Sequence, residues 1–512
     1  MGGNILAYKD LREFIAALEA RGWLRRIAEP VDCYLEITEI TDRVSKLEGD
    51  GNKALLFEHV KGYDMPVLMN AFGSYERMAL ALGVEKLDDV GDEIREILRL
   101  PYISLAHKMD VVSLLPLAKK AINFPKYVKK APCQEVVEET VDLDKLPILT
   151  CWPQDGGPFI TLPLVFTKNP TTGKRNVGMY RLQKYDKQTT GMHWHIHKNG
   201  ADNFRDTKTA GGEKIEVAVA IGADPVLTYA ATAPLPRDID EMVFAGFLRH
   251  KSVEMVKCKT VDLEVPAAAE IVLEGYVRTD EMRREGPFGD HTGYYSLADD
   301  YPVFHVTCIT HRKDPIYAAT IVGKPPMEDC YLAKATERIF LPLMQQMLPE
   351  IVDINMPLEG VFHDCCVVAI DKRYPMQARK VMHALWGMGQ MMNVKMIIVV
   401  DKHVNVQDMK EVWWRVFNNI DAKHDLEIVE GPLDVLDHSS PLAKWGAKLG
   451  IDATKTWPEE GHTRPWPDEI TMTDEVRARV DALWPRLGLE GEGGTKMRLD
   501  RKSGSAGMPR PI

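Results

Sequence analysis

The middle of the chain, roughly residues 119 to 311, constrains the fold most, because its apolar segments have the composition of β-strands. These segments are rich in β-branched residues: FITLPLVFTK, KIEVAVAIG, AAAEIVLEGYVR and VFHVTCITH. Only one segment has a clear helical pattern, DIDEMVFAGFLRH, with Asp238 near its start. Many strands with few helices predict a barrel or a curled sheet rather than a parallel sheet with crossover helices.

The segments on either side of this β-rich region alternate between helix and strand patterns. Before it, LEITEITDRVSKL and GDEIREILRL predict helices, and ALLFEHV and PVLMNAF predict strands. After it, CVVAI, MQARKVMHALWGMGQMM, MIIVVD and MKEVWWRVFNNI follow the order strand, helix, strand, helix, which predicts a parallel α/β sheet. Thr473 then opens a last helix, which Pro485 ends.

A chain of 512 residues is too long for one hydrophobic core, so these changes in pattern indicate domains. We expect a mixed α+β and α/β multidomain protein. The predicted parts are an N-terminal α/β domain over 1–115, a β domain over 116–311, a C-terminal α/β domain over 312–470, and a terminal helix with a flexible tail over 471–512.

The composition excludes several classes of protein. A net charge of −11 leaves no basic surface for nucleic acid. The chain has no apolar run of about eighteen residues and no signal-peptide core, so neither a membrane span nor export is expected. The eight cysteines are scattered, and the closest pair, Cys365 and Cys366, is adjacent, which predicts reduced thiols in the cytoplasm.

The segment Asn176 to Asn199, NVGMYRLQKYDKQTTGMHWHIHKN, contains the densest group of polar residues that could take part in catalysis or bind a metal. Alternating apolar and polar residues predict two strands joined by the polar turn DKQTT. On a strand, His193, His195 and His197 would share one face, because side chains two positions apart point the same way. The pattern is therefore compatible with a pocket lined by imidazole, Asn176 and Arg181, and equally with a half-buried sheet that has a polar outer face.

Two metal sites can be built from this part of the chain. The three histidines could form a catalytic zinc site of a hydrolase, but their spacing of roughly 6.5–7 Å along a strand makes triple ligation awkward. Asn176, His197 and Glu241 offer a mostly oxygen set, which suits Mg²⁺ or Mn²⁺ better than structural zinc. By spacing alone, the second set could also be three unrelated polar side chains.

Two further carboxylates, Glu285 and Asp290, frame the turn EGPFGD before HTGYY. A pair of acids on a short turn near an arginine can act as a proton shuttle, if burial and like charge keep one of them protonated. The alternative is a solvated loop with surface acids.

Several motifs together resemble the UbiD family of decarboxylases that use prenylated FMN. They are NVGMYRLQ, the lead-in APCQ…LPILTCWPQDGGPFIT, IGADP, EIVLEGY and EGPFGDHTGYY, and the similarity runs from LREFIAALEARG to GIDATKTWPEEG. The resemblance implies an N-terminal α/β domain, a central flavin-binding split β-barrel and a C-terminal α/β domain that builds oligomers.

The resemblance also implies a cofactor site. Asn176, His197 and Glu241 take the positions that bind a divalent metal, Mn²⁺ (or Mg²⁺), which anchors the flavin phosphate with K⁺ nearby. The residues expected to contact prenylated FMN are Asn176, Met179, Tyr180, Arg181, His193, Trp194, His195, His197, Lys198, Asn199, Thr232, Pro234, Glu241 and Lys395.

Arg181, Glu285 and Asp290 fall on the family's catalytic arginine and two acids. Arg181 would pair with the substrate carboxylate and hold Glu285 by a charge-assisted hydrogen bond. We expect Asp290 to be the proton donor, with Glu285 and Arg181 as its network. Many relatives carry Arg near the position of His193, so the histidine is a feature of this sequence.

The resemblance points to aromatic acids such as 4-hydroxy-3-polyprenylbenzoate in quinone synthesis. Related sequences also take furoates, pyrrole carboxylates, polycyclic acids and cinnamates, so heteroaromatic, polycyclic or cinnamic-type acids are the alternative. The loop Gly323 to Asp329 and the turn Asp437 to Pro441 would line the pocket.

A flavin prenyltransferase would supply the cofactor, and the assembly would be a homodimer or homohexamer. A different alternative is a non-catalytic flavin-binding subunit on the same scaffold.

Overall fold

The computed structural model describes residues 7–107, 123–138, 140–194, 199–236 and 239–489. The chain divides into two compact units, Met1–Leu343 and Met344–Ile512. The boundary falls within α9 (Glu328–Met347), so this helix begins in one unit and ends in the other. The finer four-part division expected from the sequence remains a prediction.

The N-terminal part of the first unit is the predicted α/β arrangement. Helix α1 (Leu11–Ala20) begins where Asp10 Oδ1 accepts a hydrogen bond from Glu13 N at 3.0 Å. The helices α2 (Glu36–Ser45), α3 (Tyr75–Ala81) and α4 (Asp88–His107) accompany a sheet of order β1-β2-β3-β18. Its strands are β1 (Leu24–Ile27), β2 (Ala54–Phe57), β3 (Val67–Met69) and β18 (Tyr317–Ala318).

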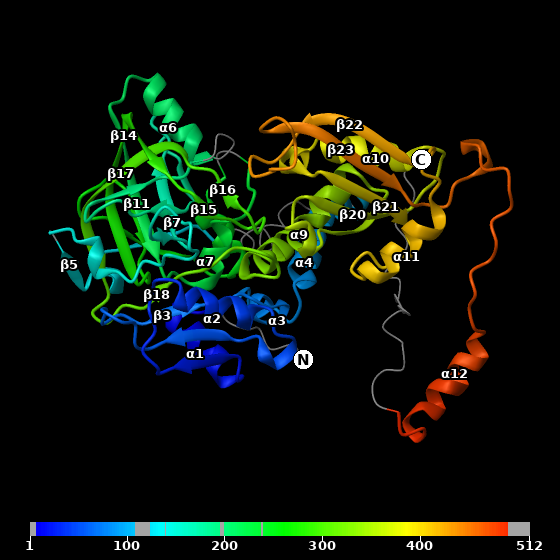
Figure 1. The fold of residues 1–512 in the computed structure, drawn as a ribbon, viewed down its shortest axis with the longest axis horizontal. Helices are drawn as coiled ribbons and strands as arrows, with labels where there is room; N and C mark the ends of the chain where they lie inside the picture. The colour runs from blue at the N-terminus through cyan, green and yellow to red at the C-terminus, as the bar shows by residue number, and fades with distance from the viewer. Residues whose placement is uncertain (1–6, 108–122, 139, 195–198, 237–238, 490–512) are drawn as a thin grey trace. The chain divides into compact units, whose positions relative to one another are not determined.

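A larger sheet lies where the split β-barrel was predicted. Its strand order is β10-β17-β14-β11-β7-β8, with β5 also paired to β17, and every pairing is antiparallel. The long strands β14 and β17 run side by side through it (Figure 1). The strands are β5 (Val136–Glu138), β7 (Leu164–Lys168), β8 (Arg175–Gly178), β10 (Thr189–Gly191), β11 (Lys214–Ile221), β14 (Ile271–Glu285) and β17 (Asp299–His311).

Smaller elements complete the first unit. The short sheets pair β6 with β9, β15 with β16, and β12 with β13 and β4. These are β4 (Lys126–Val128), β6 (Phe159–Ile160), β9 (Leu182–Gln183), β12 (Glu254–Lys257), β13 (Glu264–Pro266), β15 (Phe288–Gly289) and β16 (Tyr295–Ser296). The helices are α6 (Asn199–Thr209), α7 (Pro225–Ala230) and α8 (Glu241–Leu248).

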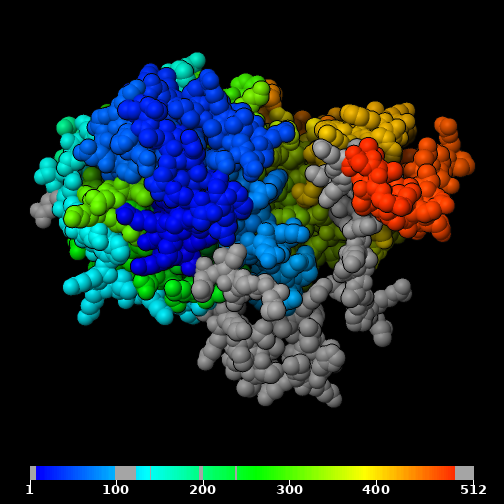
Figure 2. All heavy atoms as spheres, turned by 90° about the horizontal axis from the view of Figure 1, so that it is seen from below, coloured from blue at the N-terminus to red at the C-terminus, as the bar shows by residue number. Residues whose placement is uncertain are grey.

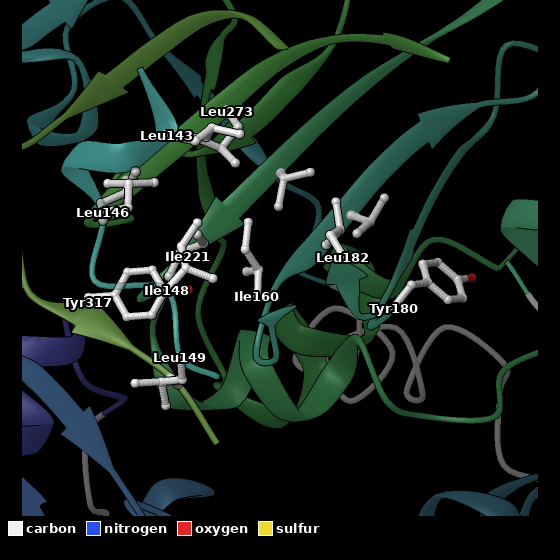
Figure 3. Close-up of a cluster of buried hydrophobic side chains, with 14 of the residues drawn as sticks. Leu143, Leu146, Ile148, Leu149, Ile160, Tyr180, Leu182, Ile221, Leu273 and Tyr317 are labelled. Atoms are coloured by element: carbon white, nitrogen blue, oxygen red, sulfur yellow. The ribbon is translucent and has the colours of Figure 1, made fainter. Parts of the chain in front are cut away.

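One continuous core joins the N-terminal part to the larger sheet. Leu55 and Phe57 of the N-terminal part belong to the same cluster of buried apolar side chains as Ile221 and Leu273 of the larger sheet. Figure 3 shows members of this cluster from the central part. Ion pairs add to this packing, because Arg12 Nη2 lies 2.8 Å from Glu270 and Arg312 Nη2 lies 3.0 Å from Asp10. Figure 2 shows the N-terminal part of the chain (blue) lying against segments of the central part (cyan to green).

The second unit contains a mixed sheet of order β19-β20-β21-β23-β22. The strands are β19 (Ile351–Asn355), β20 (Cys365–Ile370), β21 (Met396–Asp401), β22 (Leu426–Pro432) and β23 (Trp445–Asp452). The three central strands are parallel, as predicted, but β19 and β22 pair antiparallel at the edges. The helices are α10 (Gln377–Trp386), α11 (Met409–Asn419) and α12 (Asp474–Leu483).

The mixed α/β multidomain class is confirmed, and four local expectations are wrong. The helix predicted from Met376 to Met392 ends at Trp386, where Gly387 N donates to the carbonyls of the last turn. Met192 to Trp194, the described part of the strand predicted over MHWHIH, follow the end of β10 at Gly191 and form no strand, and His195 to His197 lie outside the described residues. The strand predicted over NVGMYRLQ is broken between β8 and β9. The region predicted to hold one helix also contains α6 and α7. No helix within the described residues is long and apolar enough to cross a membrane.

Candidate active site

Arg181 comes from a break between two strands. Residues Met179 to Arg181 separate β8 from β9, and Met179 N donates to Ala231 O at 3.1 Å, in the turn after α7, instead of to a neighbouring strand. The break therefore takes this segment out of the large sheet and fixes Met179 next to the turn that begins at Ala231.

The Arg181 guanidinium binds three side chains, one at the end of β14 and two from the segment that follows it. Its Nε lies 3.1 Å from Glu285 Oε1, its Nη1 2.5 Å from Asp290 Oδ2, and its Nη2 donates to Ser296 Oγ at 3.1 Å. The Phe288 ring lies 4.5 Å from the guanidinium carbon. Glu285 ends β14 and Ser296 ends β16, so the β15–β16 hairpin brings all three partners to one cation. The predicted catalytic residues are thus in direct contact.

His193 is the second group on Glu285. Its Nδ1 lies 2.7 Å from Glu285 Oε1, and its ring packs on Tyr301 with centroids 4.2 Å apart. Burial and the nearby Arg181 charge lower the pKa of His193, although Glu285 opposes the shift, so the imidazole is neutral at pH 7. Sequence analysis assigned His193 to the cofactor, and the structure shows that it also contacts Glu285.

The other oxygen of Glu285 has an unused hydrogen-bonding capacity. Glu285 Oε2 is buried and has no hydrogen-bond partner among the described residues. It lies over Gly191, where a Cβ atom would come within 2.7 Å of it. A buried polar atom without a partner is costly, so a group outside the described part of the chain is expected here.

Asp290 is held ionised in this arrangement. Burial alone would raise its pKa, but the Arg181 charge and hydrogen bonds from His291 outweigh burial and lower the pKa below its usual range. Asp290 Oδ1 accepts from His291 N at 2.9 Å and lies 3.0 Å from His291 Nδ1.

The turn that carries Asp290 is fixed from a second loop. Asp155 Oδ1 accepts from Gly289 N at 2.8 Å, and its Oδ2 accepts from Trp152 N at 2.9 Å. Trp152 Nε1 in turn donates to Val322 O at 2.9 Å. Three loops, around residues 152, 289 and 323, therefore form one wall of the site. The last of them is the Gly323 to Asp329 loop that the sequence predicted to line the pocket.

Asn176 and Glu241, two of the three predicted metal ligands, lie in contact with each other. Asn176 Nδ2 donates to Glu241 Oε1 and Val177 N donates to Glu241 Oε2, both at 2.9 Å. Asn176 Oδ1 is buried without a hydrogen-bond partner among the described residues, and burial raises the pKa of Glu241 to about 7. A cation between the amide oxygen and this carboxylate would satisfy both groups, so these residues fit a hard divalent metal. His197, the third predicted ligand, lies outside the described residues.

The remaining predicted cofactor residues are spread around these two groups. Tyr180 Oη accepts from Gly200 N at 3.3 Å, and Trp194 packs on Phe204 with its Nε1 buried and without a described partner. Thr232 Oγ1 donates to Tyr229 O at 2.7 Å, and Pro234 is partly buried in the same turn. Asn199 begins α6, and its side chain lies outside the described residues, as do His195 and Lys198.

Lys395 belongs to the second unit. Its Nζ lies 2.6 Å from Asp437 Oδ2 and also donates to Ser439 Oγ, within the turn that the sequence assigned to the pocket. The structure therefore gives this lysine a partner in its own unit. Its contact with the flavin phosphate remains a prediction.

Sequence reasoning missed four residues of the site. Ser296, Asp155, Phe288 and His291 all contact the catalytic trio or its loop. His291 and Phe288 lie inside the motif EGPFGDHTGYY, within two residues of Asp290, so the sequence could have predicted that they belong to the site. Ser296 and Asp155 carry no such signal, because only the folded hairpin and loops bring them near Arg181.

A buried arginine between two acids can bind a carboxylate and lies beside groups that can exchange a proton, which are two requirements of a carboxy-lyase site. Comparison with known proteins makes this class specific. Models of the 3-octaprenyl-4-hydroxybenzoate carboxy-lyase (UbiD) family match the chain over residues 15–96 (N-terminal domain), 126–325 (Rift-related domain) and 330–453 (C-terminal domain). An uncharacterized protein of Archaeoglobus fulgidus is 56% identical over 484 residues, which cover 94% of this chain and 99% of that protein.

Two solved structures are similar over the same length. Vanillic acid decarboxylase of Sedimentibacter hydroxybenzoicus in its closed form has a TM-score of 0.83 and 28% identity, covering 94% of this chain and 99% of its own. An evolved dimeric form of the UbiD-class enzyme HmfF from Pelotomaculum thermopropionicum, in complex with prenylated FMN, has a TM-score of 0.75 and 29% identity, covering 92% and 98%.

The chain belongs to the UbiD family. Members of this family are prenylated-FMN-dependent decarboxylases, so the protein is a carboxy-lyase of this type. The family gives no support to the alternative zinc hydrolase built on His193, His195 and His197.

Proposed function

We propose that this enzyme catalyses the reversible, non-oxidative decarboxylation of an aromatic carboxylic acid, with 4-hydroxy-3-polyprenylbenzoate as the first candidate substrate. The observation that carries the proposal is the Arg181 guanidinium held between Glu285 and Asp290 in a buried site. The similarity to a vanillic acid decarboxylase supports an aromatic acid with a ring hydroxyl. A heteroaromatic, polycyclic or cinnamic-type acid is the second candidate class.

The cofactor and metal are part of the proposal. Asn176, Glu241 and His197 would hold Mn²⁺ (or Mg²⁺), which would anchor the flavin phosphate with K⁺ nearby, and Met179 to Arg181 and Trp194 would line the flavin. The unsatisfied Asn176 Oδ1 and the buried Glu241 carboxylate support the metal. When bound, prenylated FMN supplies an electron sink for the electron pair left behind by carbon dioxide.

The protein residues bind the substrate and handle the proton. Arg181 pairs with the incoming carboxylate through a charge-assisted hydrogen bond. This second anion shares the guanidinium with Asp290, and the like charge raises the pKa of Asp290, so Asp290 takes up a proton. After carbon dioxide has left, Asp290 gives this proton to the carbon that carried the carboxyl group. His193 and Arg181 keep Glu285 in place throughout.

The first test is to express the chain together with a flavin prenyltransferase and purify it without air. We expect bound prenylated flavin by absorbance and by mass after denaturation, and Mn²⁺ by elemental analysis. A panel of hydroxybenzoates, furoates and cinnamates would then be screened for carbon dioxide release, and for uptake of labelled bicarbonate in the reverse direction. A protein that binds metal but no flavin would overturn the proposal.

The metal site has its own test. Glu241→Ala removes one oxygen ligand, and we expect a flavin-poor protein with little Mn²⁺, measured by flavin absorbance per chain. Glu264→Ala, on the nearby strand β13, is the matched control and should retain its flavin. If Glu241→Ala bound as much flavin as the unmodified enzyme, Glu241 would have no part in the metal site.

A further inference from the structure

The proposed reaction uses one proton in each turnover, because a carboxylate is replaced by hydrogen while neutral carbon dioxide leaves. The proposed donor, Asp290, is only 5% exposed and is surrounded by Arg181, His291 and the β15–β16 hairpin. Asp290 therefore needs a route by which it regains a proton from solvent. The inference below rests on the proposed function.

His291 is placed between Asp290 and the outside. Its Nδ1 lies 3.0 Å from Asp290 Oδ1, while the other oxygen of Asp290 is bound to Arg181. The side chain of His291 is 18% exposed, against 7% for that of Asp290. An imidazole can take up a proton at one ring nitrogen and release one from the other, so this geometry suits transfer to Oδ1.

A second acid, Asp329, lies close enough to His291 for the two charges to interact. Asp329, in the first turn of α9, is partly buried, and its Oδ1 accepts from Cys330 N at 2.9 Å. The turn after His291 packs on the loop before Asp329, because a Cβ on Gly293 would lie 3.3 Å from Lys324 Cα. Burial raises the pKa of Asp329 to about 6; the His291 charge opposes this shift, and the Asp290 charge adds to it. Asp329 therefore exchanges protons close to neutral pH.

We propose that His291 and Asp329 form a proton relay that reloads Asp290 after each turnover. The Asp329 carboxyl group gives its proton to Nε2 of the neutral ring, and the Nδ1 proton passes to Asp290 Oδ1. Water returns a proton to Asp329. Exchange with water then removes the Nε2 proton and places one on Nδ1, so the relay moves one proton inward and returns to its starting state. Among the described residues, charged groups near His291 are Asp290, which is bound to Arg181, and Asp329. Both relay residues act through Asp290 and need no contact with substrate.

The decisive variant is His291→Asn, whose amide nitrogen can replace Nδ1 as a hydrogen-bond donor but cannot carry a proton. We expect kcat to fall about 10²-fold, with KM and flavin content unchanged. Added imidazole should restore part of kcat, because a free base can replace the missing ring. The matched control is His305→Asn, which removes another carboxylate-paired imidazole, 2.7 Å from Glu281, and should leave kcat unchanged.

A second measurement is independent of turnover. In cofactor-free protein labelled with ¹⁵N-histidine, Asp329→Asn should lower the titration midpoint of His291, because a nearby negative charge that favours the imidazolium is lost. The His291→Asn spectrum identifies the signal by its absence. Asp329→Asn should also lower kcat without changing KM.

The outcomes separate the relay from the function. If the unmodified, flavin-loaded enzyme releases carbon dioxide from no acid, the proposed function fails and the relay fails with it as a catalytic device, whatever the titration shows. If that enzyme is active but His291→Asn keeps its full kcat, the relay is wrong. A loss of kcat that imidazole does not restore, with an unmoved His291 midpoint in Asp329→Asn, would show a purely structural histidine and also overturn it.

Discussion

At the scale of single residues, Glu285 is the acid whose two oxygens differ most. Oε1 accepts a hydrogen bond from Arg181 Nε and lies 2.7 Å from His193 Nδ1, whereas Oε2 is buried and has no hydrogen-bond partner among the described residues. A carboxylate keeps a second acceptor oxygen when the first is bound, whereas an amide carries an NH₂ donor at that position. The chemistry of Glu285 therefore depends on the carboxylate and on more than the size of the side chain.

Glu285→Gln should abolish turnover and leave flavin bound. If the amide nitrogen of Gln took the place of Oε1, it could not accept the hydrogen bond from Arg181 Nε, which would lose its partner. An amide also cannot exchange a proton at neutral pH. The measurement is carbon dioxide release together with flavin absorbance of the purified variant. Glu281→Gln, on the same strand but away from Arg181, is the control and should remain active. Retained activity of Glu285→Gln would remove Glu285 from the proton network.

Asp290 should make the stability of the protein depend on pH in acid. Its pKa in the folded state lies below that of an unfolded aspartate, about 3.9, so its ion pair stabilises the fold fully above that pH and progressively less as pH falls toward the folded-state pKa. We expect Asp290→Asn to lose about 2 kcal/mol at pH 7, because the buried Arg181 loses one of its two anions. Urea unfolding at pH 7, 5 and 3.5 should show this difference shrinking in acid. A difference that stays constant would contradict the ion pair.

The sequence predicted that Arg181, Glu285 and Asp290 belong to one site, but it did not predict which residues surround them. Arg181, Glu285 and Asp290 were assigned by the family resemblance, and the structure brings them into contact. Ser296 was missed because a serine gains meaning only when the β15–β16 hairpin folds back on Arg181. At this scale, short motifs identify the charged residues of the site. The polar side chains that bind them can be identified only from the folded structure.

At the scale of elements, the strand pattern, read from β-branched composition or from alternation, was the most reliable signal. It identified β7, β11, β14 and β17, whose inward side chains supply much of the first unit's core. It failed where the backbone leaves the sheet, as at Met179 to Arg181, since local pattern does not show that Met179 N pairs with Ala231 O. Helix α6 was missed because its sequence, NGADNFRDTKT, is polar and lacks a wide apolar stripe.

The irregular pairing of β14 with β17 gives an element-scale prediction. The register shifts between Glu274 and Gly275, and a Cβ on Gly275 would lie 1.8 Å from His305 O. Gly275→Ala must therefore separate the two strands that carry the sheet, and we expect a loss of more than about 2 kcal/mol, seen as a lower Tm. Gly387→Ala is the control, because its Cβ meets carbonyl oxygens only at 3.5 Å and beyond. Equal Tm values for the two variants would contradict this account of the bulge.

At the scale of the whole molecule, the described residues that we propose for catalysis and for metal binding all belong to the first unit, Met1–Leu343. The second unit instead presents an apolar surface on α11. Trp413, Trp414 and Phe417 are 37%, 46% and 76% exposed, and the rings of Trp413 and Phe417 stack with centroids 5.7 Å apart. Neighbouring exposed aromatics on one helix are typical of a protein interface.

We expect this α11 surface to bind a second copy of the chain, in line with the homodimer or homohexamer predicted from the sequence. Replacing Trp413 and Phe417 together by Ser should weaken self-association at least about 10-fold, since buried aromatic residues contribute most to such interfaces. Light scattering after size exclusion would show a smaller mass at micromolar concentration, with an unchanged circular dichroism spectrum. Phe124→Ser replaces another exposed phenylalanine, in the first unit, and should leave the mass unchanged. An unaltered mass of the double variant would show that copies of this chain associate through a different surface.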